Sequence, residues 1–335
     1  MYIFDLNKLK KGDIILEKDN NQTSELVRKL SHSTFSHAIL YVGGGSCLEA
    51  DDIVTSFNIQ RKLVENKDYV CVLRLKDEVD PLILENIIVN ARLNVGMSYS
   101  LDDAKGIISE KYRPGNPRRQ TCTRFVAQSF EKAGVKLVDN ANFCSPEELL
   151  NSNLLIKVED VLREATDNDV EYANSESVLP KQHEIIKKVL EDAREVTKSD
   201  VQEINELKDF VIRHQEFDDA IAEILIQSGY LDLWREEEER LPYHYDLTKF
   251  VQFYGKNVLA AAQLILEESQ PELMRYMFCH FQLLQDVKMF GHLKVVKLFA
   301  DLYENLTDFT MRRMVVAESV IDYFYNGLTD DNVGE

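Results

Sequence analysis

The sequence predicts an α+β domain with a small antiparallel sheet, followed by an all-α domain. Short β-branched and apolar runs, separated by glycine or proline, recur between residues 14 and 158. A polar, acidic stretch follows at 164–177. Beyond about residue 180 the apolar residues recur at helical spacing. We therefore expect a first domain at 1–165, a linker at 166–180 and a helical domain at 181–335.

The size and composition of the chain fit two globular domains. It has 335 residues, of which 44% are hydrophobic and 9% aromatic, enough for a core in each domain. The formal net charge of −19 excludes general nucleic-acid binding, which needs a basic surface. The five cysteines are scattered and form no C-x-x-C pair, which favours free thiols over a disulfide framework or a zinc site.

Two features of the sequence predict the cellular location of the protein. Residues 1–8 lack the basic region, the apolar run and the cleavage site of a secretory signal. No apolar stretch reaches membrane-spanning length. We expect a cytoplasmic protein without a transmembrane segment; secretion as an effector by a signal-independent route is the alternative.

Local signals define the elements expected in the first domain. Strands are expected at 14–17, 36–42, 47–50, 54–57, 69–75 and 154–158, with a glycine turn at 43–45. Helices are expected at 23–30, 80–94, 101–110, 121–134 and 145–150. The prolines and glycine of the loop 111–119 exclude regular structure there.

In the second domain, cap and stop signals predict a bundle of about seven helices. The signals are Ser199 as the cap of a helix over 200–214, Gly229 as the end of one over 217–228, Pro271 as the start of one that runs to Phe290, and Thr307 as the cap of the last helix, ending near Gly327. No repeat period indicates a solenoid.

The segment 120–134 carries the main chemical signal. Thr121 can cap the start of this helix and Gly134 can close its end. Cys122 shares the spacing of the apolar face, so its thiol should point toward the core. The unpaired amides and the dipole at a helix start favour an anion such as a thiolate, the nucleophilic form of cysteine.

The predicted hairpin supplies a base and a group to orient it. His37 and Glu49 are twelve residues apart and can lie on one face of adjacent strands, although the register cannot be read from sequence. A thiol nucleophile needs a base, and the imidazole needs its second nitrogen held. We therefore consider Cys122 as nucleophile, His37 as base and Glu49 as the orienting group, with helix amides binding the oxyanion. The other interpretation is a buried cysteine, a structural histidine and a salt-bridged glutamate.

Motifs in the first domain resemble those of the circularly permuted NlpC-type, papain-like amidases. In chain order they are Lys11-Gly12-Asp13-Ile14-Ile15, Ser36-His37-Ala38-Ile39-Leu40-Tyr41-Val42-Gly43, Leu48-Glu49-Ala50, Gly96-Met97-Ser98-Tyr99, Thr121-Cys122-Thr123-Arg124-Phe125-Val126 and Ser145-Pro146-Glu147-Glu148-Leu149. They look most like the YiiX/YaeF-type hydrolases, which are related to the lecithin:retinol acyltransferases. In these families the histidine strand precedes the cysteine helix, the reverse of papain.

The resemblance covers about residues 9–158. It implies a permuted papain-like fold with Cys122 as nucleophile, His37 as base and Glu49 as third member. It implies nothing about the helical domain.

One position departs from this resemblance. The family commonly has an acidic residue two positions after the cysteine, where this chain has Arg124. With Arg118 and Arg119 nearby, the entrance to the site would be locally basic. Our hypothesis is that these arginines bind a carboxylate or phosphate of the substrate; the alternative is pairing with surface carboxylates. Tyr41, in the histidine strand, is a further candidate for substrate binding.

The expected activity is that of a thiol hydrolase, an amidase or peptidase, which cleaves an amide or ester bond through an acyl-enzyme and needs no metal or organic cofactor. The substrate would be a peptide, an isopeptide or an acyl lipid. Acyl transfer to or from a lipid, or thioesterase-like chemistry, is one alternative. Another is a papain-like scaffold with an inert thiol, in which the helical domain binds a protein partner.

Overall fold

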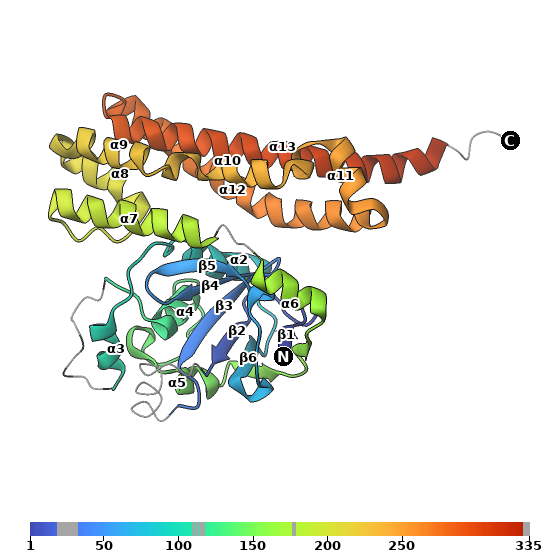
Figure 1. Ribbon diagram of the computed structural model, residues 1–335. Helices are drawn as coiled ribbons and strands as arrows, with labels where there is room; N and C mark the ends of the chain where they lie inside the picture. Colours follow the sequence, from blue (N-terminus) through green and yellow to red (C-terminus); the bar gives the residue numbers. More distant parts are fainter. Residues whose placement is uncertain (19–32, 109–110, 112, 114–117, 176–178, 331–335) are drawn as a thin grey trace. The chain divides into compact units, whose positions relative to one another are not determined.

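The computed structural model describes residues 1–18, 33–108, 111, 113, 118–175 and 179–330 (Figure 1). The chain divides into two compact units, Met1–His183 and Glu184–Glu335. The helix expected at 23–30 lies outside the described residues, and so do positions 109 and 110 of the helix expected at 101–110.

A six-stranded antiparallel sheet forms the centre of the first unit. Its strand order is β5-β4-β3-β2-β6-β7, and every neighbouring pair is antiparallel. The strands are β2 (Ile14–Glu17), β3 (His37–Gly43), β4 (Ser46–Ala50), β5 (Val54–Asn58), β6 (Val70–Leu75) and β7 (Leu155–Val158). All six expected strands are therefore present, and the α+β prediction is confirmed for this unit.

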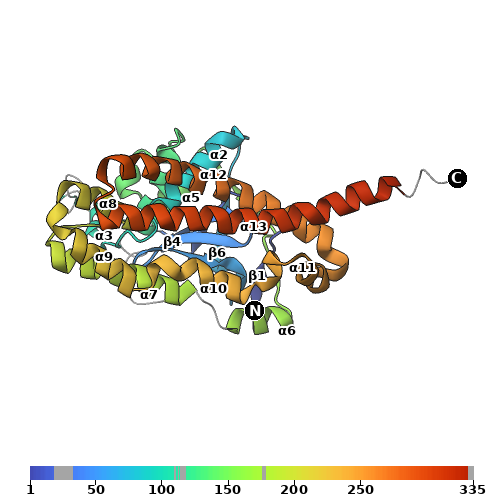
Figure 2. The same cartoon turned by 90° about the horizontal axis from the view of Figure 1, so that it is seen from above.

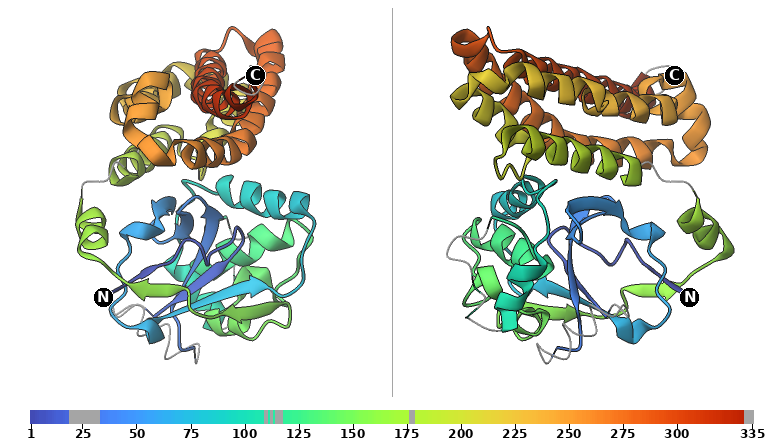
Figure 3. Two further views of the ribbon diagram at one scale, coloured as in Figure 1. Left: turned by 90° about the vertical axis from the view of Figure 1, so that its right-hand side faces the viewer. Right: turned by 60° about the vertical axis from the view of Figure 1, so that its left-hand side comes forward.

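Apolar side chains cover both faces of the sheet, and alternation along each strand separates them. One face carries Leu16, Ala38 and Leu40, while Ile15 and Ile39 belong to a cluster on the other. The first face packs against helices α2 (Pro81–Arg92) and α4 (Cys122–Glu131), whose buried residues join the same cluster. Figure 3 shows these teal and green helices on one side of the blue strands.

Side chains cap the N-terminal ends of helices next to this sheet, as expected. The Asp80 carboxylate accepts a hydrogen bond from the Leu82 amide at 2.8 Å, and Pro81 follows it in the first turn of α2. Ser145 and Glu148 form a reciprocal capping box at α5 (Pro146–Leu150). Helix α3 (Leu101–Ile108) lies between α2 and α4 in the chain.

A second, two-stranded sheet was not expected. Strand β1 (Tyr2–Phe4) pairs antiparallel with β8 (Leu162–Glu164), which brings the start and the end of the first unit together. Phe4 and Val161 join the cluster on the second face of the main sheet. A strand of three residues is too short to show the alternation of apolar and polar residues by which a strand is recognised in a sequence.

The acidic segment expected to be a linker contains a helix. Residues Asp167–Asn174 form helix α6, which begins with a capping box between Thr166 and Asp169. The guanidinium of Arg61 lies 4.6 Å from the ring centroid of Tyr172 on this helix. Two of its three acidic residues, Asp167 and Asp169, lie in the first turn, where negative charge interacts favourably with the positive end of the helix dipole.

Residues 179–330, described without a gap, contain seven α-helices. They are α7 (Leu179–Thr197), α8 (Ile204–Arg213), α9 (Asp218–Gln227), α10 (Leu233–Arg240), α11 (Leu247–Tyr254), α12 (Val258–Phe290) and α13 (Lys294–Asp330). The two longest, α12 and α13, pack along each other (Figure 2). No helix in the described part of the chain is long and apolar enough to cross a membrane.

Three of the helix boundaries expected in this unit are wrong. Pro271 lies inside α12, which continues because clusters on either side of it pack against α13. Thr307 lies inside α13, where its hydroxyl donates to the Tyr303 carbonyl one turn earlier at 2.7 Å instead of capping a helix. Helix α8 begins at Ile204, beyond the expected cap Ser199. The expected end at Gly229 is confirmed, since this glycine has a φ of +77°.

Candidate active site

Helix α4 presents Cys122 as its first residue. The Thr121 hydroxyl accepts a hydrogen bond from the Arg124 amide at 3.4 Å, as expected of the cap. Gly134, with a φ of +87°, follows the end of the helix. The amides of Cys122 and Thr123 begin the helix, so no carbonyl of α4 is available to accept from them.

The thiol of Cys122 lies inward, at the edge of the core. Cys122 is 6% exposed and belongs to the cluster that includes Val126 and Phe130. Its Sγ lies 3.9 Å from the Ser36 carbonyl oxygen. Because Ser36 directly precedes His37, the start of α4 meets the start of β3.

His37 and Glu49 are neighbours across the hairpin of β3 and β4. Ile39 pairs directly with Glu49, which places His37 two positions away on the same face, in the diagonal relationship. The His37 Nε2 and the Glu49 Oε2 lie 2.8 Å apart, and each side chain is 19% exposed. The expected contact between the two residues is confirmed.

The surroundings of this pair favour the charged form of both groups. Burial alone would lower the pKa of His37, because it disfavours the charged imidazolium. Hydrogen bonds to Cys122 and Glu49, and the charges of these two groups, outweigh burial and raise the pKa of His37 well above 6.5. Burial likewise acts to raise the pKa of Glu49, yet its hydrogen bond and charge interaction with His37 lower it overall. Since Nε2 contacts Glu49, Nδ1 is the ring nitrogen left for the thiol.

Two further charged residues that the sequence reasoning missed lie beside the pair. Glu17 is the direct partner of His37 in the ladder between β2 and β3. The Lys62 ammonium lies 2.6 Å from the Glu17 carboxylate, and Lys62 also interacts with Glu49. Burial works to lower the pKa of Lys62, but Glu17 and Glu49 raise it. An acidic residue ending the strand next to the histidine strand is the sequence signal that could have identified Glu17.

A cavity of about 450 Å³ opens on this side of the sheet. His37, Glu49 and Lys62 contribute to its wall, as do Asp51 and Tyr69. Its volume is within the range of small-molecule sites. The candidate base and its orienting carboxylate are therefore accessible from a concave surface.

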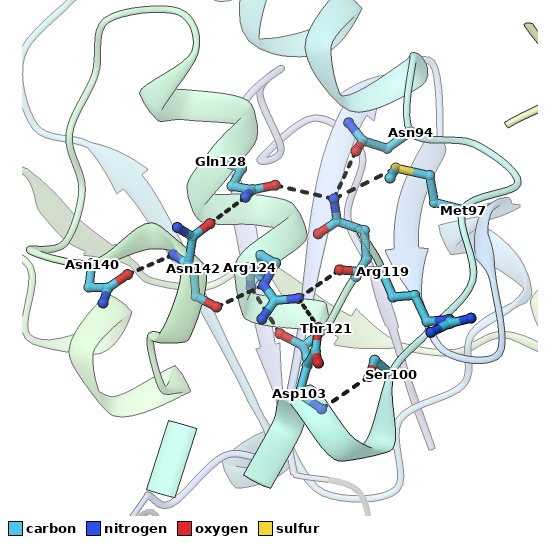
Figure 4. A network of polar contacts seen from close by, with 11 residues as sticks. Asn94, Met97, Ser100, Asp103, Arg119, Thr121, Arg124, Gln128, Asn140 and Asn142 are labelled. Carbon is cyan, nitrogen blue, oxygen red and sulfur yellow. Dashed lines mark hydrogen bonds and ion pairs between the residues drawn. The ribbon is translucent and has the colours of Figure 1, made fainter. Parts of the chain in front are cut away.

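Arg124 does not lie at a basic entrance, and that expectation is wrong. It is fully buried, and its Nη1 donates to the Asp103 carboxylate at 2.7 Å and to the Arg119 carbonyl at 2.6 Å (Figure 4). Its Nε donates to the Asn142 carbonyl at 2.7 Å. The guanidinium thus ties α4 to three neighbouring segments. Arg118 and Arg119 have exposed side chains, and their assignment to anion binding stays a prediction.

Tyr41 is also buried. It is 4% exposed within the cluster on the second sheet face, and its hydroxyl accepts a hydrogen bond from the Gly45 amide at 3.2 Å. Tyr41 therefore braces the glycine turn between β3 and β4. The expectation that it binds substrate is wrong, because its hydroxyl is used inside the protein.

Comparisons with known proteins give distant likenesses among solved structures. No protein-family model and no curated protein matches the chain. A solved structure described as the metalloprotein yiiX from Escherichia coli O157:H7 is similar over 45% of this chain and 97% of its own, with 16% identity and a TM-score of 0.38. At this distance the likeness assigns no family, residue or activity to this chain.

Among the described residues, no group of three or more His, Cys, Asp or Glu side chains is placed to hold a metal ion.

Proposed function

We propose that the first unit is a permuted papain-like cysteine hydrolase that cleaves an amide or ester bond through an acyl-enzyme on Cys122. The observation that carries the proposal is the position of the Cys122 thiol beside the residue that precedes His37, with Sγ 3.9 Å from the Ser36 carbonyl oxygen, together with the contact between His37 and Glu49. The order of the elements supports it, since the histidine strand precedes the cysteine helix, as in the family that the motifs resemble.

The chemistry begins with proton transfer from the thiol to Nδ1 of His37. The Cys122 sulfur then attacks the carbonyl carbon, and the carbonyl oxygen takes up the negative charge. The first amides of α4 point toward this position and bind the oxyanion. His37 returns the proton to the leaving amine or alcohol, so the bond breaks and a thioester remains. General acid–base catalysis of this kind contributes about 10²- to 10⁴-fold to the rate.

Hydrolysis of the thioester reverses the roles. His37 removes a proton from water, the hydroxide attacks the acyl carbon, and the thiol leaves with the proton that the imidazolium carries. Glu49 holds Nε2 throughout, so Nδ1 keeps facing the sulfur, and its charge stabilises the imidazolium that forms in both steps. No metal or organic cofactor takes part in this scheme.

The test compares two thiols of the same chain. Cys71 is more exposed than Cys122, and burial raises the pKa of the Cys71 thiol. On brief treatment with iodoacetamide at neutral pH, we expect peptide mass spectrometry to show faster labelling of Cys122, despite its lower exposure. His37→Ala should abolish this preference, whereas His280→Ala, a change on α12, should leave it intact. Equal or slower labelling of Cys122 in the unmodified protein would refute an activated nucleophile.

The substrate is then found by product analysis. Peptide, isopeptide and lipid-ester libraries are incubated with the protein and with Cys122→Ala. We expect turnover of an amide or ester class that Cys122→Ala does not support. Transfer of an acyl group to an added amine or alcohol in preference to water would identify an acyltransferase instead. The role of the helical unit in partner binding remains a prediction.

A further inference from the structure

Helix α12 is apolar on two opposite sides. On one side Ala262, Ile265 and Leu283 are buried and join clusters that contain residues of α13. The opposite side carries six large apolar side chains that are between 44% and 65% exposed. We call this surface the α12 face; it consists of Met274, Met277, Phe278, Phe281, Leu284 and Met289. A helix that is apolar all round is normally buried all round, yet in the described part of the chain only one side of α12 is covered.

The α12 face forms a stripe along the helix. Met274, Met277, Phe281 and Leu284 follow one another at spacings of three and four residues, and Phe278 lies one turn after Met274. This is the spacing of the positions through which two helices pack along each other. Residues 274–285 are all described, and none of their exposed positions carries a charge, although 29% of the residues in the chain are charged. The stripe is therefore suited to contact with another apolar surface.

The α12 face is large enough for a stable protein–protein contact. If a fully exposed side chain of this size offers about 200 Å², the exposed fractions leave about 700 Å² of the face accessible. The largest apolar patch on a monomeric protein is typically about 300–600 Å². Each partner in a stable complex buries about 800 Å². The face thus offers most of the area that a stable dimer needs.

Two opposite charges flank the α12 face at nearly equal distances from its centre. Glu267 precedes Phe278 by eleven residues and Lys288 follows it by ten, and both side chains are exposed. Glu267 is also seven residues before Met274, and Lys288 is seven after Phe281, so both charges continue the stripe. A second copy of the face, laid antiparallel on the first, brings Lys288 of each copy beside Glu267 of the other. Parallel pairing would place like charges together.

We propose that α12 is a dimerisation helix, through which two copies of this chain associate antiparallel about a two-fold axis near Phe278. The proposal does not depend on the proposed function. The apolar residues of each copy cover those of the other, and the contact between Glu267 and Lys288 forms twice and fixes the direction of pairing. Because both copies use the same face, the assembly closes as a dimer.

The first test measures the oligomeric state of the full chain. Because interfaces of this size have dissociation constants from picomolar to micromolar, sedimentation velocity should show a dimer at tens of micromolar protein. Phe278→Glu places two carboxylates near the two-fold axis and should give a monomer at the same concentration. Val315→Glu adds the same charge at an exposed position of α13, outside the α12 face, and should remain dimeric.

The second test checks the direction of pairing. Lys288→Glu places a carboxylate beside Glu267 of the other copy at both ends of the interface, so we expect the dissociation constant of the dimer to rise about tenfold. Glu267→Lys should weaken the dimer in the same way. Combining the two changes exchanges the charges and should restore the dissociation constant of the unmodified protein. In a parallel pair each single change would replace one like-charged contact by another and would alter the constant little.

The outcomes decide the proposal. A monomer at tens of micromolar would overturn it, because the α12 face would then be covered by something other than a second copy. A dimer that persists in Phe278→Glu would also overturn it, because the contact would lie elsewhere on the chain. A dissociation constant that neither Lys288→Glu nor Glu267→Lys changes would contradict the antiparallel arrangement. Phe278 is 62% exposed, so Phe278→Glu should keep the helical circular dichroism of the unmodified protein, and the charge exchange tests the contact without altering the apolar residues.

Discussion

The Glu49 carboxylate lies diagonally across the hairpin from the His37 imidazole, with Oε2 and Nε2 2.8 Å apart. Glu49→Gln keeps an oxygen for this contact but removes the charge. Because burial alone acts to lower the pKa of His37, we expect this variant to lower that pKa. The measurement is an NMR titration of the His37 ring.

The same variant should also slow the labelling of Cys122 by iodoacetamide near neutral pH, because fewer imidazolium–thiolate pairs would be present. Glu65→Gln changes an exposed residue of the cavity wall and is the matched control. If the His37 ring titrates identically in Glu49→Gln and in the unmodified protein, Glu49 does not stabilise the imidazolium.

The raised pKa of His37 also predicts how stability depends on pH. A group whose pKa is higher in the folded state stabilises the fold fully below its unfolded pKa of about 6.5, and this contribution is lost as the pH rises through the folded value. We expect the difference in unfolding free energy between the unmodified protein and His37→Ala to shrink as the pH rises. Urea denaturation at a series of pH values measures it. A difference that grows with pH would contradict the assigned shift.

Several parts of the fold could be predicted because the signals for them are local. The cap at Asp80-Pro81, the glycine turn and the alternation in the strands each act over a few residues. The strands β1 and β8 could not be predicted, since they pair with each other across about 160 residues, and the other backbone partner of β1, Val64, is about 60 residues away. The helix start predicted at Pro271 was wrong for a related reason. Packing of α12 on α13 outweighs the tendency of proline to interrupt a helix.

The sequence likewise predicted some contacts of the candidate site and not others. Alternation suggested that His37 and Glu49 share a face, and only the observed register could establish it. The place of Glu17 and Lys62 beside them depends on a third strand and a loop, whose positions no spacing reveals. Arg124 was misassigned because a sequence does not show whether a cation is buried or exposed. In the structure Arg124 is buried and paired with Asp103 of another helix.

This buried pair leads to a prediction about stability. Arg124→Met would leave the Asp103 carboxylate, 13% exposed, without its cation, and two backbone carbonyls without a donor. Breaking a buried ion pair on one side costs about 3–5 kcal/mol. Urea denaturation should show a loss of this size in unfolding free energy.

The control is Arg118→Met, at an exposed position, which should change the unfolding free energy by less than about 0.5 kcal/mol. For any substrate that is turned over, Arg124→Met should leave the Michaelis constant unchanged at temperatures where it is folded. A large rise in the Michaelis constant with little loss of stability would restore Arg124 as an anion-binding residue.

The final prediction concerns Lys62 and the acid side of the pH profile. Lys62 interacts with Glu49 and helps to keep the pKa of that carboxyl below 4.5. Replacing Lys62 therefore raises the pKa of Glu49, and the pH at which Glu49 becomes protonated and releases His37 moves upward. Lys62→Met alone would also leave Glu17, 8% exposed, without its partner, so the variant is combined with Glu17→Gln.

In this double variant we expect the acid limb of the pH–rate profile for Cys122 acylation to move to higher pH, while the rate near neutral pH stays close to that of the unmodified protein. Glu17→Gln alone keeps the Lys62 ammonium beside Glu49 and should leave the limb in place. The double variant keeps the overall charge of the protein, and Lys76→Met, which removes an exposed lysine, should also leave the limb in place. An acid limb that moves equally in the double variant and in Glu17→Gln would assign the effect to Glu17, because that result would show that the Lys62 charge does not act on Glu49.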